Sequence, residues 1–111
     1  HKNILQFCQT LNLSYVVPSY QTESILDVAA LIEKLDLIIS PDTSIVHLAS
    51  AFNRPIISIH ENNKDSYQLF APKSEINRTV FAKYQKGIKG FSVAHLLKYC
   101  DELMKLIEIK H

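Results

Sequence analysis

Hydrophobic residues recur along this chain in two patterns, and each pattern predicts a different kind of element. Spacings of three and four residues predict amphipathic helices, whereas short apolar runs predict strands. The helices are predicted at residues 3–13, 22–34, 43–52 and from 92 onward, and the strands at residues 15–17, 37–39, 56–59 and 79–82. The runs at 37–39 and 56–59 do not alternate with polar residues, so we expect both to be buried on two faces.

Residues that cap helices support these boundaries. Thr22 or Ser24 can cap the second helix, and Ser92 can cap the last one. Asn53 can end the third helix in the left-handed conformation. The stretch from His60 to Asn77 is polar and is predicted to be irregular, and a loop of that length usually carries function or is disordered.

The order of the elements predicts the fold class. Strands that alternate with helices favour right-handed crossovers, so we expect an α/β fold with a Rossmann-like parallel sheet and flanking helices. The length of 111 residues fits one domain, residues 1–111. Because the first element is a helix with no strand before it, we expect that this domain is truncated or that another chain completes the sheet in an oligomer.

Composition and charge exclude several classes of function. The chain is 47% hydrophobic with a net charge of +1, and its basic residues form no stripe, which argues against nucleic acid as a partner. No apolar run approaches the ~18 to 20 residues of a membrane span, and the N-terminus has no signal-peptide pattern, so we expect a cytoplasmic protein. Cys8 and Cys100 are predicted to be buried free thiols. The histidines and cysteines show no spacing typical of a metal site.

The stretch from Ser40 to Ala49 is the strongest candidate for chemistry, because it joins a predicted strand to a predicted helix. Ligands of open α/β sheets bind at that edge, and the first amides of a helix favour phosphate. Asp42 can cap the helix, or its carboxylate can accept hydrogen bonds from the hydroxyl groups of a sugar. Thr43 and His47 share one face of the helix and suit a diphosphate. His47 can instead be a histidine that packs on the sheet.

Further candidates follow the strand at 56–59. His60 and Glu61 can form a proton-transfer pair, touch a ligand, or belong to a solvated loop. Tyr67 and Phe70 can stack on a nucleobase or sugar, or serve only in packing. The basic residues from position 64 to position 89 can contact a phosphorylated acceptor or an anionic membrane surface, or form a solvated face.

Three segments carry a resemblance to a known family. Residues 42–49 read Asp-Thr-Ser-Ile-Val-His-Leu-Ala after an apolar strand, and residues 51–55 lead through a proline into the next strand. Residues 24–32 read Ser-Ile-Leu-Asp-Val-Ala-Ala-Leu-Ile. In order and spacing these segments resemble the heptosyltransferase family, which is glycosyltransferase family 9.

Enzymes of this family build the core of bacterial lipopolysaccharide from a nucleotide sugar, typically ADP-heptose. The resemblance implies a GT-B enzyme in which this chain is the C-terminal, donor-binding part. It implies that Asp42 binds sugar hydroxyls, that Thr43 and Ser44 hold the diphosphate, and that His47 lies nearby. It also implies that no metal or other cofactor is needed. The general base and the site for the lipopolysaccharide acceptor would belong to a separate N-terminal domain, so this chain would contain no catalytic residue. Such an enzyme would work in the cytoplasm, either free or peripherally at the inner membrane.

Three departures from the family pattern leave a second interpretation open. Ser44 stands where the family has a glycine, which puts a side chain where the backbone should approach phosphate. Ile45 replaces a proline, and Glu61 brings a negative charge to the place where the family has Gly-Pro-Thr. The alternative function is therefore a non-catalytic binding or assembly module on the same fold.

Overall fold

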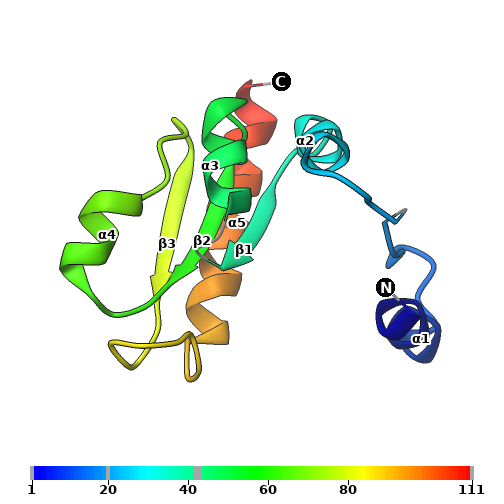
Figure 1. The fold of residues 1–111 in the computed structure, drawn as a ribbon, viewed down its shortest axis with the longest axis horizontal. Coiled ribbons are helices and arrows are strands. Elements are labelled where there is room, and N and C mark those ends of the chain that lie inside the picture. Colours follow the sequence, from blue (N-terminus) through cyan, green and yellow to red (C-terminus); the bar gives the residue numbers. More distant parts are fainter. Residues whose placement is uncertain (1, 20, 42–43, 111) are drawn as a thin grey trace.

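A parallel sheet of three strands forms the centre of the molecule (Figure 1). The computed structural model describes residues 2–19, 21–41 and 44–110. The strands are β1 (Ile38–Pro41), β2 (Ile56–His60) and β3 (Asn77–Phe81), in the spatial order β1-β2-β3. This arrangement confirms the predicted α/β fold with a Rossmann-like parallel sheet.

Helices cover both faces of the sheet (Figure 1). They are α1 (Lys2–Leu11), α2 (Ile25–Glu33), α3 (Ser44–Ala51), α4 (Lys64–Phe70) and α5 (Val93–Lys110). α2 and α3 pack on one face, and α5 packs on the other. α4 lies beside β3, whereas α1 lies to one side and is joined to α2 by an extended segment (Figure 1).

The central strand β2 supplies the core on both faces, because successive residues of a strand point to opposite sides. Ile56 packs with Val46 of α3 and Ile32 of α2, and all three are buried. Ile57 points the other way and packs with Val80 and with Leu103 of α5. All five residues of β2 are buried, which confirms the expectation of two covered faces for this strand.

The same expectation is wrong for β1. Ile38 is 5% exposed, but its neighbour Ile39 is 47% exposed. β1 lies at an edge of the sheet, and no further strand pairs with it among the described residues. Because α5 packs against β2 and β3, it leaves the corresponding face of β1 open to solvent.

The strand predicted at residues 15–17 is also absent from the described structure. The amide of Val16 donates to the carbonyl of Leu13 in a turn, and residues 16–19 have no regular secondary structure. Tyr15 and Val17 are 80% and 75% exposed. An extended segment becomes a strand only when a neighbouring strand accepts its hydrogen bonds, and this segment has no such neighbour here.

The stretch from His60 to Asn77 is more regular than the sequence suggested, because it contains α4. Asn63 caps this helix, and its side-chain oxygen accepts a 3.2 Å hydrogen bond from the amide of Ser66. The prediction of an irregular loop is therefore wrong for residues 64–70. An Asn followed three residues later by Ser is a weak capping signal, and seven helical residues carry little periodicity.

Three of the predicted caps, at Ser24, Ser92 and Asn53, are confirmed. Ser24 accepts from the amide of Asp27 at 3.3 Å, and Ser92 accepts from the amide of His95 at 3.1 Å. Asn53 has a φ of 51°, which is the left-handed conformation expected at the end of α3. These residues fix where three of the helices begin or end.

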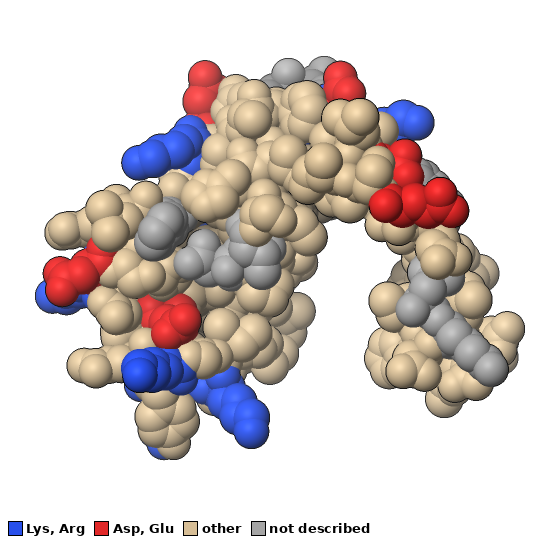
Figure 2. Space-filling view, in the orientation of Figure 1, with Lys and Arg blue, Asp and Glu red and all other residues tan. Residues whose placement is uncertain are grey.

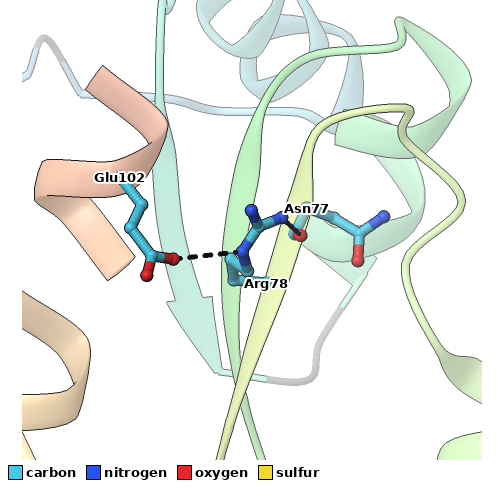
Figure 3. Close-up of polar contacts among 3 residues, drawn as sticks. All are labelled: Asn77, Arg78 and Glu102. Atoms are coloured by element: carbon cyan, nitrogen blue, oxygen red, sulfur yellow. Dashed lines mark hydrogen bonds and ion pairs between the residues drawn. The ribbon is translucent and has the colours of Figure 1, made fainter. Parts of the chain in front are cut away.

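An ion pair joins α5 to β3 (Figure 3). Arg78 Nε donates to Glu102 Oε2 at 3.4 Å, and Arg78 Nη1 donates to the carbonyl oxygen of Asn77 at 2.8 Å. Elsewhere, Cys8 and Cys100 are free and half-buried thiols. Within the described residues, none of the helices combines the length and the apolar character that crossing a membrane would require.

Candidate functional site

The carboxyl ends of the three parallel strands define one edge of the sheet. Pro41 of β1 lies opposite Ile59 of β2, and His60 of β2 lies opposite Phe81 of β3. The segments that follow these strands therefore meet at this edge, which is where open α/β sheets bind ligands. It holds the start of α3, the segment 61–63 between β2 and α4, and the segment after β3.

Two of the five predicted site residues, Asp42 and Thr43, lie outside the described residues. Ser44 is the first residue of α3 and is exposed. His47 lies about one turn further along the same helix and is also exposed. The first turn of a helix presents backbone amides and a positive dipole, which favour an anion such as phosphate.

Glu61, the fifth predicted residue, directly follows β2 and is half-buried. Its carbonyl oxygen accepts a 2.8 Å hydrogen bond from the amide of Asn63 and lies 2.8 Å from Nδ1 of His60. Because β1 and β2 are neighbours in the sheet, Ser44 and Glu61 lie at the same edge. The structure thus brings the start of α3 and the segment 61–63 to one side of the sheet.

The structure excludes one of the predicted roles of His60, that of a solvated loop residue. It is the last residue of β2 and only 1% exposed. Its ring lies edge-on to the rings of Tyr67 and Phe81, with centroids 5.3 Å and 6.3 Å away. Its Nδ1 lies 2.8 Å from the main-chain oxygen of Glu61, and this contact does not involve the carboxylate. This geometry therefore gives no support to a proton-transfer pair.

Tyr67 belongs to the packing between α4 and the sheet. Its ring centroid lies 4.9 Å from that of Phe81, and its hydroxyl lies 3.1 Å from Oγ1 of Thr79. These contacts agree with the packing role among its two predicted roles. Phe70 is the last residue of α4.

A hollow lined by polar residues lies in the surface next to Glu61. None of its lining residues is among the five predicted site residues. The hollow has a volume of about 490 Å³ and is lined by Asn62, Asn63, Lys64, Asp65 and Gln85. It joins the segment after β2 to the segment after β3, so it lies on the carboxyl side of the sheet. Two asparagines that follow a buried strand after one intervening residue, Glu61, were the available signal, but in a sequence they are equally typical of a turn.

A second cavity, of about 290 Å³, lies at the opposite, amino ends of the strands. Its lining consists of Asp36, Asn53, Arg54, Pro55, Glu75, Ile76 and Ile107. Arg54 and Pro55 directly precede β2, and Ile76 directly precedes β3. Ser44, His47 and Glu61, the predicted site residues that the structure describes, do not line this cavity.

On the face seen in Figure 2, acidic side chains gather at one margin, near α2, and most of the basic side chains lie toward the opposite margin. No group of three or more His, Cys, Asp and Glu side chains within the described parts of the chain is arranged to hold a metal ion. Among the described residues, the carboxyl edge offers hydroxyl, amide and imidazole groups, the charged side chains of Glu61, Lys64 and Asp65, and the start of α3.

A parallel sheet with helices on both faces and polar residues at its carboxyl edge defines the class of Rossmann-like α/β proteins. Comparison with protein families identifies the family within this class. The family model described as glycosyltransferase family 9 (heptosyltransferase) matches residues 21–94, which include all five predicted site residues. The chain belongs to this family, as the resemblance predicted. Searches of curated proteins and of solved structures gave no significant match.

Proposed function

We propose that this chain is the donor-binding part of a heptosyltransferase-like enzyme of the GT-B type. In this proposal it forms a single, truncated C-terminal domain that holds a nucleotide sugar. Family 9 glycosyltransferases in general use a nucleotide-sugar donor and a glycan acceptor. The observation that carries the proposal is that the family match spans β1, α3, β2 and the segment after β2, the elements that form the carboxyl edge.

The proposed roles follow from the chemistry at that edge. Asp42 would accept hydrogen bonds from the sugar hydroxyls. The Thr43 hydroxyl and the amides of Thr43 and Ser44 would hold the diphosphate, supported by the positive end of the α3 dipole. His47, on the first turns of α3, would lie beside the phosphates. These groups orient the donor and neutralise the diphosphate as it leaves, so in this proposal no metal or other cofactor is required.

This chain would bind the donor but would not transfer the sugar by itself. In the proposed enzyme the general base and the acceptor site belong to a different domain. We propose ADP-heptose or a related nucleotide sugar as donor and a lipopolysaccharide or lipooligosaccharide core as acceptor. The work would take place in the cytoplasm, with peripheral attachment to the inner membrane as a further possibility that vesicle binding can test.

A non-catalytic binding or assembly module remains the second candidate, and two residues favour it. Ser44 adds a side chain at the first position of α3, and Glu61 is half-buried beside the edge where a diphosphate would lie. In this candidate the outer side of β1, which is an edge strand among the described residues, would pair with another chain, and Ile39 on this strand is partly exposed. Sedimentation of the chain across a concentration series tests such an assembly.

Calorimetric titration separates the two candidates. ADP, UDP, GDP and CMP, with ADP-heptose, are titrated into the wild type and into the variants Asp42→Ala and His47→Ala. Donor binding predicts that one nucleotide binds, that its sugar form binds more tightly, and that Asp42→Ala removes this extra affinity. His95→Ala changes a histidine on α5 and is expected to bind as the wild type does. Absence of binding by every probe would favour the assembly module.

A further inference from the structure

Tyr67 joins α4 to the sheet through its hydroxyl group. This oxygen lies 3.1 Å from Oγ1 of Thr79 in β3, and Thr79 Oγ1 lies 3.1 Å from Oγ of Ser58 in β2. Thr79 and Ser58 are register partners in the sheet. Because each hydroxyl can donate one hydrogen bond and accept others, the three groups form a continuous chain from the helix to the central strand.

The ring of Tyr67 is held at the same junction. Its centroid lies 5.3 Å from that of His60 and 4.9 Å from that of Phe81, with interplanar angles of 82° and 70°. These are edge-to-face contacts, the geometry that aromatic pairs favour. His60 and Phe81 are themselves register partners at the carboxyl ends of β2 and β3. The sheet thus holds both the ring and the hydroxyl of Tyr67.

The segment 61–63 is held between this junction and the segment that follows β3. The amide of Asn62 donates to the carbonyl of Tyr84 at 2.9 Å, and the amide of Asn63 donates to that of Glu61 at 2.8 Å. The amide of Tyr67 in turn donates to the carbonyl of Asn63 at 3.0 Å. A shift of α4 would therefore displace this segment.

The helix itself depends on these contacts. α4 has seven residues, and helices of that length are not stable in water without tertiary packing. Leu69, on the same helix, is 73% exposed and contributes little burial. Tyr67 is therefore a principal anchor of α4 among the side chains that the structure describes.

We propose that Tyr67 is a positioning residue for the donor site, because its contacts hold the segment 61–63 in one conformation before any ligand arrives. The proposal rests on the proposed function in one respect: it takes this segment to border the bound donor. A segment that is already ordered loses less conformational entropy on binding, which raises affinity. Tyr67 acts through the segment and does not itself touch the donor.

Hydrogen exchange of the full chain tests the positioning directly. Tyr67→Phe keeps the ring and removes the hydroxyl, and loss of one hydrogen bond of typical strength predicts about fivefold faster exchange of the amides of Asn62, Asn63 and Tyr67. Thr79→Val should have the same effect, and Thr79→Ser, which keeps a hydroxyl, should restore the wild-type rates. Amides of α3 and α5 should not change in any of these variants.

The control removes a hydroxyl from a different part of the molecule. Tyr15 is 80% exposed, so Tyr15→Phe is expected to leave every rate unchanged. Equal acceleration over the whole chain in Tyr67→Phe would mean that the residue contributes only to overall stability. That result, or no acceleration at all, would overturn the proposal.

Nucleotide titration distinguishes a failure of this proposal from a failure of the proposed function. For a nucleoside diphosphate that binds the wild type, Tyr67→Phe should raise the Kd by about three- to fivefold. If ADP, UDP and GDP all fail to bind the wild type, donor binding fails, and the exchange rates alone decide whether Tyr67 holds the segment. If the wild type binds and Tyr67→Phe binds equally tightly, the positioning role is refuted.

Discussion

Among single residues, those on the central strand decide how the two faces of the sheet are held. Ile56 belongs to the core shared with α2 and α3, whereas Ile57 belongs to the core shared with α5. Both side chains are fully buried. The helix on the second face contributes Leu103, which is also fully buried and packs with Ile57 and Val80.

Truncation of Leu103 should therefore destabilise the chain strongly. We expect Leu103→Ala to lower the free energy of unfolding by about 2–5 kcal/mol, because it removes buried methyl groups and leaves a cavity. Leu97 lies on the same helix and is 62% exposed, so Leu97→Ala should change stability by less than about 0.5 kcal/mol. Urea unfolding of both variants measures the difference. Equal effects would show that α5 does not pack on the sheet through Leu103.

The ion pair between Arg78 and Glu102 should contribute much less. Their side chains are 37% and 39% exposed, and water and salt weaken a pair at such positions. A double-mutant cycle with Arg78→Gln and Glu102→Gln should give a coupling energy of about 0.2–1 kcal/mol at low salt, which falls toward zero near ~1 M salt. A coupling that persists at high salt would contradict the half-exposed position of this ion pair.

Among the elements, α5 is the longest helix that the structure describes, and its start depends on a cap. The side-chain oxygen of Ser92 accepts a 3.1 Å hydrogen bond from the amide of His95. We expect Ser92→Ala to lower the free energy of unfolding by about 0.5–2 kcal/mol. Ser92→Asp can still cap the helix, so it should keep most of the wild-type stability. Thermal unfolding of the two variants checks this, and equal losses for Ala and Asp would argue against a capping role.

How well each element could be predicted depended on how far its own residues determine it. The caps at Ser24, Asn53 and Ser92 are local, and the sequence located them correctly. Ile39 was misjudged because its exposure depends on where α5 packs, which no local pattern records. At the candidate site, the predicted parallel sheet implies that Ser44 and Glu61 lie at one edge, since parallel strands end together, and the structure has both residues there.

The contacts around Tyr67 could not be predicted from the sequence. Its partners come from two other elements, and the hydroxyl chain through Ser58 and Thr79 depends on the register of β2 and β3. α4 itself was missed because its seven residues carry one cap and little periodicity. Both features follow from tertiary packing and not from propensity.

Across the whole molecule, the protection of backbone amides from hydrogen exchange should fall from the central strand toward α1. β2 is buried along its length, whereas Ile4 and Phe7 of α1 are 55% and 62% exposed. We expect the amides of β2 to exchange most slowly and those of α1 at rates near those of an unfolded chain, because exposed helices open locally. Mass spectrometry of hydrogen exchange measures both. Protection of α1 equal to that of β2 would contradict this and would mean that another surface covers α1.

The central claim is that ligand binds at the carboxyl edge of the sheet, and nuclear magnetic resonance tests it most directly. ADP and ADP-heptose are titrated into the isotope-labelled chain while its backbone amides are followed. We expect chemical-shift changes at Ser44, His47 and segment 61–63, with the amides of Arg54 and Ile76 at the opposite end unchanged. Changes confined to the opposite end, or none with either nucleotide, would contradict binding at the carboxyl edge.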